Sequence, residues 1–316
     1  MQKEFAIETQ ALTKRYSEEV LAVNGVDLAV PTNSIYALLG PNGAGKTTTV
    51  SMLTTLIQPT AGTARVAGFD VVREAGEVRA RIGVTFQEIV LDPDLTGRDT
   101  LDFHGRLYNM PKAQRQAKIA ELLPLVGLAE AADRRTKTYS GGMKRRLELA
   151  RGLMTAPEVL FLDEPTQGLD PQNRATIWEY IRDLQANTNI TLLLTTHYME
   201  EAEALADLVG IIDHGRLIAE ETPQAFINQL GSDVFHIEGS GKQDAFLQRI
   251  RQMPFVQDVN INNGRIQISA GEGRGRLVEI VQTSQATGFH IEDVSIAKPT
   301  LGDVFLKFTG NQLRDK

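Results

Sequence analysis

A chain of 316 residues is long enough for two domains, and its composition, 42% hydrophobic and 23% charged, is typical of a soluble globular protein. No stretch approaches the roughly 20 unbroken apolar residues of a membrane span, and residues 1–10 lack a signal-peptide core. The formal net charge of −7 argues against a broad nucleic-acid-binding face, and the absence of cysteine excludes disulfides and thiolate metal sites. We therefore expect a protein of a reducing cytosol that is not itself a channel.

The first informative segment is an apolar run, Ile35–Leu39, followed directly by the pattern GxxxxGK[ST]. The residues of this pattern, with the threonine after it, are Gly40, Pro41, Asn42, Gly43, Ala44, Gly45, Lys46, Thr47 and Thr48. Glycines let the backbone take strained or positive-φ conformations, so that successive N–H groups face nucleotide phosphates. A helix predicted over residues 45–57 adds the partial positive charge of its N-terminus, Lys46 adds a full charge, and the Thr47 hydroxyl is a ligand for Mg²⁺. The segment predicts a nucleotide-phosphate cradle.

A strand-like run over residues 82–86 ends in Gln87, which the sequence alone would place at the surface. Between Gln87 and Ser140 the apolar residues recur at spacings of three and four, which predicts helices. These residues are Leu101, Leu107, Ile119, Leu122, Leu123, Val126 and Leu128. The stripe is either core or docking surface, and the sequence does not separate the two.

Tyr139 is followed by Ser140, Gly141, Gly142 and Met143, and a helix is predicted over residues 144–153. Ser140 is a natural N-cap residue, and the two glycines leave the start of the helix open to an anion. By itself, Ser-Gly-Gly before a helix is an ordinary capped loop. Its position after Lys46 and just before the next buried strand gives it weight.

Two further apolar strands end in polar residues. The run 159–162 ends in Asp163 and Glu164, and the run 190–196 ends in His197. Because the carboxyl ends of parallel strands meet at one edge of a sheet, we expect these side chains to gather beside the phosphate cradle. Asp163 would hold Mg²⁺ through its water shell, Glu164 would polarise the attacking water, and His197 would reach the γ-phosphate.

The character of the chain changes beyond Pro223. Strands and helices are predicted in the order βαββαβ, over residues 234–238, 243–252, 256–261, 265–269, 277–284 and 289–296, which indicates a ferredoxin-like domain. Asn263 and Gly264 are predicted to form the hairpin turn. The glycine-rich stretches 239–241 and 271–275 mimic phosphate loops but lack Lys and Ser/Thr, so they are predicted to be turns.

With all these motifs in order, residues 5–225 resemble the ATP-binding subunit of an ABC transporter. The resemblance implies an α/β P-loop NTPase cassette with an inserted helical subdomain at about residues 88–150, so that residues 1–230 form the ATP-binding domain and residues 231–316 the ferredoxin-like accessory domain. It also implies that YSGGM is the signature sequence, with Met143 where Gln is commonest. Ser140, Gly141 and Gly142 would then contact the γ-phosphate of ATP held by the opposite subunit.

The same resemblance gives roles to four further positions. Gln87 matches the glutamine that touches Mg²⁺ and the attacking water and links to the membrane partner. Asp170, in the Gly-Leu-Asp-Pro sequence 168–171, matches the loop that crosses the dimer interface. His197 matches the switch histidine, and Tyr16 matches the aromatic residue that stacks on adenine.

The C-terminal tail, in which Leu301, Val304, Phe305 and Phe308 fall at helical spacing, resembles that of drug-exporter ATPases of the daunorubicin-resistance type. This implies a homodimer that binds ATP and Mg²⁺, sits peripherally at the cytoplasmic side of the cell membrane on separate permease subunits, and drives export. Two alternatives stay open: a soluble ABC ATPase that acts on nucleic acid or ribosomes, and a regulator that binds ATP without hydrolysing it.

Overall fold

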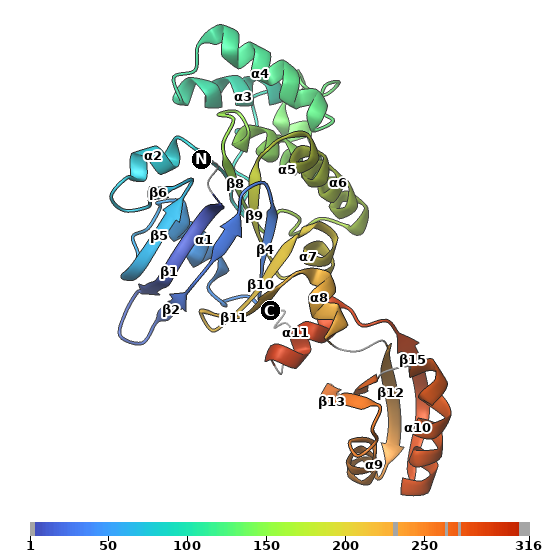
Figure 1. Ribbon diagram of the computed structural model, residues 1–316. Helices are drawn as coiled ribbons and strands as arrows, with labels where there is room; N and C mark the ends of the chain where they lie inside the picture. Colours follow the sequence, from blue (N-terminus) through green and yellow to red (C-terminus); the bar gives the residue numbers. More distant parts are fainter. Residues whose placement is uncertain (1–3, 230–232, 263–264, 271–272, 310–316) are drawn as a thin grey trace. The chain divides into compact units, whose positions relative to one another are not determined.

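The computed structural model describes residues 4–229, 233–262, 265–270 and 273–309. The chain divides into two compact units, Met1–Glu220 and Glu221–Lys316 (Figure 1). The second unit thus begins at Glu221, whereas the sequence-based division is at residue 231. As a result, helix α8 (Pro223–Asn228) belongs to the second unit.

A six-stranded sheet forms the centre of the first unit, in the order β11-β10-β4-β9-β8-β7. Its strands are β4 (Ile35–Leu39), β7 (Ile82–Thr85), β8 (Val159–Asp163), β9 (Thr191–Thr196), β10 (Leu208–Asp213) and β11 (Arg216–Glu221). Neighbours from β10 to β7 pair in parallel. Every residue of β4, β8 and β9 is buried, which explains why these strands read as continuous apolar runs instead of alternating ones.

An antiparallel sheet lies beside it, in the order β2-β1-β5-β6 with β3 paired to β1. Its strands are β1 (Phe5–Arg15), β2 (Leu21–Val26), β3 (Ala29–Pro31), β5 (Ala61–Val66) and β6 (Phe69–Asp70). Helix α1 (Lys46–Leu53) contacts β2 and β5 of this sheet and β8 of the other. The prediction that this helix extends to residue 57 was wrong. Thr55 takes a left-handed φ of 65°, which a β-branched residue cannot adopt within a helix.

Among the described residues, the first unit has six further α-helices and a short 3-10 helix, η1 (Thr136–Thr138). The α-helices are α2 (Ala75–Arg79), α3 (Gly97–Leu107), α4 (Lys112–Leu125), α5 (Gly141–Gly152), α6 (Pro171–Asn187) and α7 (Met199–Leu205). Helices α3 and α4 pack on each other and on α5, which forms the inserted helical layer (Figure 1). Most of the predicted apolar stripe is buried there, from Leu101 to Leu128, whereas Leu107 is 63% exposed. The stripe is therefore mainly core.

The loop between β4 and α1 depends on its glycines in two different ways. Gly43 and Gly45 have φ values of 82° and 106°, which side-chain-bearing residues rarely adopt. Gly40 instead needs space, because a Cβ there would lie 2.2 Å from the Ile212 carbonyl oxygen. A Cβ on Gly45 would also approach the Ala22 carbonyl oxygen to 2.5 Å, whereas one on Gly43 would meet open space.

The second unit contains a four-stranded antiparallel sheet in the order β13-β14-β12-β15. Its elements are β12 (Asp233–Gly241), α9 (Gln243–Ile250), β13 (Val256–Asn262), β14 (Arg265–Ala270), α10 (Gly273–Thr287) and β15 (Phe289–Ala297), followed by α11 (Leu301–Thr309). This is the predicted βαββαβ order, and the strand arrangement is that of a ferredoxin-like fold. A core that includes Phe235, Phe246 and Phe289 joins α9 and α10 to the sheet. Asp303 of α11 accepts a hydrogen bond from Gln267 of β14.

The prediction of a turn at residues 239–241 was wrong, because these residues continue β12. Gly239 pairs with Ile291 after a register shift, and a Cβ on Gly239 would lie 2.2 Å from the His290 carbonyl oxygen. The glycine thus allows a close strand approach at a bulge. The predicted turn at Asn263 and Gly264 lies outside the described residues, and α10 already begins at Gly273 within the other glycine-rich stretch.

We expect a protein truncated after Thr222 to fold and to bind ATP, because the core of the first unit is formed by residues between Ala6 and Ile212. Thermal unfolding followed by circular dichroism should show one cooperative transition. The matched fragment 223–316 should unfold separately. A truncated protein without a cooperative transition would show that the second unit completes the first core.

Alanine substitution at Gly43 and Gly45 should separate the two roles of glycine in the β4–α1 loop. Gly43→Ala should cost about 1 kcal/mol of unfolding free energy, the usual cost of a left-handed alanine. Gly45→Ala should cost more, since its Cβ also meets the Ala22 carbonyl oxygen at 2.5 Å. Urea unfolding of both variants measures the difference. Equal losses would mean that the approach of β2 to the loop imposes no constraint.

Candidate functional site

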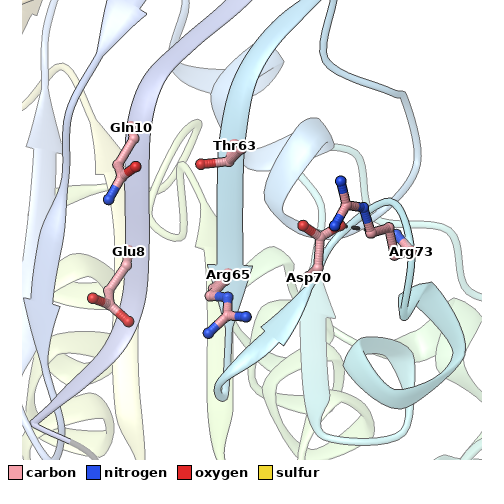
Figure 2. A pocket seen from close by; sticks show the side chains of 6 residues that line it. All are labelled: Glu8, Gln10, Thr63, Arg65, Asp70 and Arg73. Carbon is pink, nitrogen blue, oxygen red and sulfur yellow. Dashed lines mark hydrogen bonds between the residues drawn. The ribbon is translucent and has the colours of Figure 1, made fainter.

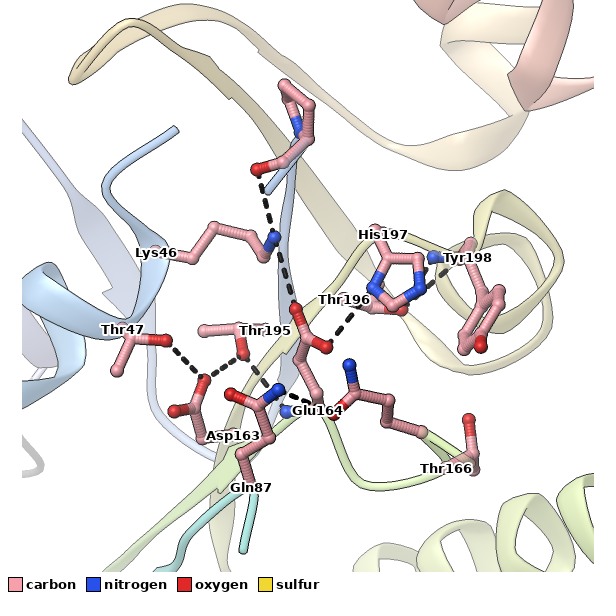
Figure 3. Close-up of polar contacts among 12 residues, drawn as sticks. Lys46, Thr47, Gln87, Asp163, Glu164, Thr166, Thr195, Thr196, His197 and Tyr198 are labelled. Carbon is pink, nitrogen blue, oxygen red and sulfur yellow. Dashed lines mark hydrogen bonds and ion pairs between the residues drawn. The ribbon is translucent and has the colours of Figure 1, made fainter. Parts of the chain in front are cut away.

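Four predicted segments meet at one edge of the parallel sheet. In the strand registers, Leu39 pairs with Thr196 and Asp163 pairs with Thr195, so β4, β8 and β9 end side by side. The phosphate-type loop, the acidic pair and His197 therefore follow three adjacent strands. Figure 3 shows the side chains of Lys46, Asp163, Glu164 and His197 converging there.

Lys46 projects back over the loop that precedes it. Its Nζ donates to the carbonyl oxygens of Gly40 at 2.8 Å and Pro41 at 3.1 Å, and lies 3.2 Å from Glu164 Oε1 (Figure 3). The side chain is only 4% exposed. Burial lowers the pKa of Lys46, and the charges of Glu164 and Asp163 offset part of that effect. The ammonium group of Lys46 thus interacts electrostatically with the carboxylates of Asp163 and Glu164.

The carboxylate of Glu164 lies between the ammonium group of Lys46 and the imidazole ring of His197. Besides the contact with Lys46, its Oε2 lies 3.2 Å from Nδ1 of His197 (Figure 3). Burial raises the pKa of Glu164, but the close contact with His197 and the charge of Lys46 outweigh this effect and hold the pKa below its ordinary value. The carboxylate is therefore ionised at neutral pH and able to act as a base.

Asp163 is 2% exposed and accepts hydrogen bonds from two hydroxyl groups. Thr195 Oγ1 donates to its Oδ1 at 2.5 Å, and Thr47 Oγ1 donates to the same oxygen at 3.3 Å. A hydroxyl and a carboxylate are hard oxygen donors of the kind that Mg²⁺ prefers, so this pair fits the predicted cation. No motif in the sequence singled out Thr195. Its position two residues before His197, in the strand next to β8, was the available signal.

Gln87 follows β7, whose Thr85 pairs with Leu162 in the neighbouring strand. The residue therefore reaches the same edge as Asp163. Its amide Nε2 donates a hydrogen bond to Oε1 of Gln167 at 2.5 Å, so the amide binds this exposed side chain and not Asp163. Gln167 was not singled out by the sequence.

Ser140 caps α5, as predicted, and its side chain accepts a hydrogen bond from the Met143 N–H at 3.2 Å. Ser140 and Gly141 are exposed. A Cβ on Gly142 would lie 2.5 Å from Oδ1 of Asn173, so this glycine permits close packing on the start of α6. Asp170 caps α6 by accepting a hydrogen bond from the Asn173 N–H at 3.0 Å. The signature-like segment and the segment around Asp170 are thus neighbours within one chain.

Tyr16 is 57% exposed, and the Lys14 ammonium lies 5.3 Å from the centre of its ring. Its N–H donates to the Val20 carbonyl in the turn that leads into β2. Two residues further along, the Ala22 carbonyl lies against Gly45 of the loop. The aromatic ring is therefore carried by a hairpin that borders the phosphate-type loop.

Two other side chains near the edge were missed by sequence reasoning. Glu201 of α7 is fully buried and accepts hydrogen bonds from Thr166 at 2.7 Å and Trp178 at 3.1 Å. Burial raises its pKa, and hydrogen bonds offset part of that rise. The ring of Tyr198, next to His197, lies 3.8 Å from the Arg174 guanidinium. No periodicity or spacing in the sequence marks these contacts.

A separate polar cavity of about 360 Å³ lies on the antiparallel sheet, and none of the residues that line it belongs to a predicted motif (Figure 2). It is lined by Glu8, Gln10, Thr63, Arg65, Asp70 and Arg73. The carboxylate of Asp70 already accepts hydrogen bonds from the N–H groups of Val72 and Arg73, which lower its pKa. Two acidic and two basic side chains line the cavity, so their charges cancel and favour neither an anionic nor a cationic ligand. We therefore assign this cavity no role.

Curated relatives match this chain over almost its whole length. The daunorubicin resistance ATP-binding protein DrrA2 of Streptomyces coeruleorubidus is 42% identical over 313 residues, which cover 98% of this chain and 96% of that protein. The linearmycin resistance ATP-binding protein LnrL of Bacillus subtilis is 37% identical, with 98% and 100% coverage. The Nod factor export ATP-binding protein I of Paraburkholderia xenovorans is 41% identical, with 99% of each chain covered.

Solved structures of ATP-binding cassettes share the fold of this chain. The cbiO1 protein of Clostridium perfringens, part of an ABC transporter complex, matches with a TM-score of 0.67 and 25% identity over 72% of this chain and 92% of that one. A dimeric ATP-binding cassette in a post-hydrolysis state with ADP and phosphate matches with a TM-score of 0.61 over 68% and 98%, and at 24% identity it shows the fold alone. Within the part of the chain that the structure describes, no helix combines the length and apolar character of a membrane span. The sequence profile of the family described as ABC transporter matches residues 23–167, and with these relatives it shows that the chain belongs to the ATP-binding subunits of ABC transporters.

Proposed function

We propose that this ABC ATPase works as a homodimer on separate permease subunits at the cytoplasmic side of the membrane and powers export of a drug-like substrate. The convergence of Lys46, Asp163, Glu164 and His197 at one sheet edge is the observation that carries the ATPase part of the proposal. The names of the relatives concern resistance to daunorubicin and linearmycin and export of Nod factor, and they favour export as the direction.

ATP would bind along the loop from Gly40 to Thr48, with its phosphates on the backbone N–H groups and on Lys46. The positive φ of Gly43 and Gly45 supports this, because it turns successive N–H groups toward one side. Bound Mg²⁺ supplies charge neutralisation on the phosphate oxygens, and Thr47, Asp163 and Gln87 are the residues that would hold it. Tyr16 would stack on the adenine ring.

Hydrolysis would depend on Glu164 and His197. The ionised Glu164 carboxylate would accept a hydrogen bond from the attacking water and take up its proton as the water oxygen bonds to the γ-phosphorus, while the bond from that phosphorus to the β-phosphate oxygen breaks and ADP leaves. The 3.2 Å contact with His197 supports a role for the histidine in holding that carboxylate and in reaching the γ-phosphate. Gln87, at the end of the adjacent strand β7, would orient the same water.

In the dimer, Ser140, Gly141 and Gly142 of one subunit would contact the γ-phosphate bound by the other, and Asp170 would lie at the interface. The exposure of Ser140 and Gly141 at the start of α5 supports this arrangement, because a helix N-terminus attracts phosphate. The formal net charge of −7 supports a partner other than nucleic acid.

A cleft of about 370 Å³ supports the permease as a partner. Its lining includes Leu56, Phe86, His104, Tyr108 and Arg151, and its apolar members Leu56, Phe86 and Tyr108 are exposed. Phe86 directly precedes Gln87, so a permease segment bound in this cleft would change the position of Gln87 relative to the bound nucleotide. Burial lowers the pKa of His104 to about 4, which keeps this side chain neutral at physiological pH.

Lys46→Ala should weaken ATP binding about ten- to hundredfold, because a charge-assisted hydrogen bond to phosphate contributes about 1.5–3 kcal/mol. Titration with a fluorescent ATP analogue measures the change. Lys118→Ala, on α4, is the control and should bind as the wild type does. Unchanged affinity in a folded Lys46→Ala protein would show that the glycine loop does not hold the nucleotide.

Glu164→Gln should bind ATP normally but hydrolyse it at least about 100-fold more slowly, since an amide keeps the shape of the side chain without its basicity. ATP-bound dimers should then accumulate on size-exclusion chromatography. Glu158→Gln, which alters the opposite end of the same strand, is the matched control and should hydrolyse normally. Hydrolysis at the wild-type rate by Glu164→Gln would refute the assignment.

A further inference from the structure

The guanidinium of Arg145 binds four backbone carbonyl groups at the centre of the first unit. This residue of α5 is 3% exposed. Its Nε donates to the Pro165 carbonyl at 2.5 Å, and its Nη1 donates to the Phe86 carbonyl at 2.7 Å. Its Nη2 donates to the carbonyls of Asp163 at 3.0 Å and Glu164 at 2.7 Å. One side chain of α5 therefore forms hydrogen bonds with the backbone at the ends of both β7 and β8.

The backbone of Glu164 is in a conformation that needs such support. Its φ is 49°, in the left-handed region that residues with side chains rarely occupy, and strain of this kind persists only where the surroundings over-determine it. The Glu164 N–H donates to the carbonyl and the hydroxyl of Thr195, both at 3.1 Å. Arg145 holds the carbonyl on the other side of the same residue. With both backbone groups held, the carboxylate points toward Lys46 and His197.

Lysine cannot reproduce this arrangement. Arginine has five N–H donors in a rigid planar fork, whereas lysine has one ammonium group with three donors on a flexible stem. Burial lowers the pKa of Arg145, and the charges of Glu148, Glu201 and Asp163 offset part of that effect. The four carbonyl dipoles further solvate the buried cation, so the helix and the two strand ends stabilise each other.

We propose that Arg145 is a positioning residue for hydrolysis: it fixes the left-handed backbone of Glu164, and with it the carboxylate, to the helix that carries Ser140 and Gly141. This inference rests on the proposed role of Glu164 as the base. The same guanidinium holds the Phe86 carbonyl, one residue before Gln87, so both groups proposed to act on the water move with α5.

The test compares ATP hydrolysis by Arg145→Lys with that of the wild-type protein. We expect kcat to fall about 10- to 100-fold, as for a displacement of about 1 Å at a reacting group, while KM for ATP changes less than about twofold. Arg115→Lys is the matched control, because Arg115 is 8% exposed and bound to Asp102 and the Met110 carbonyl within the helical layer. It should lose similar thermal stability without losing kcat.

A double variant separates positioning from general structural support. If Arg145 acts mainly through Glu164, then Arg145→Lys should cause a much smaller loss of residual hydrolysis in a Glu164→Gln background than in the wild type, with the small remaining loss due to Gln87. Additive losses would overturn the proposal, as would a wild-type kcat in Arg145→Lys while Glu164→Gln is inactive. Wild-type hydrolysis by Glu164→Gln alone would instead defeat the proposed function.

Folding is checked by circular dichroism at the assay temperature, with Arg145→Gln as a second variant. A folded Arg145→Gln protein with lowered kcat and unchanged KM would support the proposal. Unfolding of both Arg145 variants where Arg115→Lys stays folded would overturn it and leave Arg145 a purely structural residue.

Discussion

The parallel pairing of β4, β8 and β9 is the constraint on which the rest of this structure depends. Each strand is buried on both faces, and each delivers its next residues to the same sheet edge. Lys46, Glu164 and His197, far apart in the sequence, come within 3.2 Å of their neighbours because the registers align Leu39 with Thr196 and Asp163 with Thr195. A shift of one residue in the register of β8 and β9 would move Glu164 and His197 apart along the strand direction by about 3.3 Å.

The site brings several charged groups into a nearly dry environment, and each is balanced locally. Burial opposes the charge on Lys46 and on Glu164, yet their mutual contact, with His197 beside them, favours the charged forms. Arg145 is balanced by backbone carbonyls. Each charged group is thus held by its neighbours within the chain, a fixed arrangement that would suit the electrostatic stabilisation of phosphoryl transfer that we propose.

Some details of the structure differ from what the sequence predicts, because residue types alone do not specify local backbone geometry or side-chain partners. Helix α1 ends at Leu53 because Thr55 turns left-handed, and residues 239–241 extend β12 because Gly239 allows a bulge against His290. Gln87 reaches the predicted edge, but its amide binds Gln167. In each case the segment was located correctly, while its end or its partner depended on a neighbouring strand or side chain.

The sequence by itself determined the buried strands, the glycine-rich loop between β4 and α1 and the βαββαβ order of the second unit, because glycine spacing, continuous apolar runs and helical periodicity are local properties, and its resemblance to ABC ATP-binding subunits implied the cassette fold. Only the tertiary structure decided that Thr195 binds Asp163, that Glu201 is buried under Thr166 and Trp178, and that Arg145 grips the ends of two strands. These contacts join residues distant along the chain, and hydrogen bonds to backbone carbonyls leave no mark on residue types.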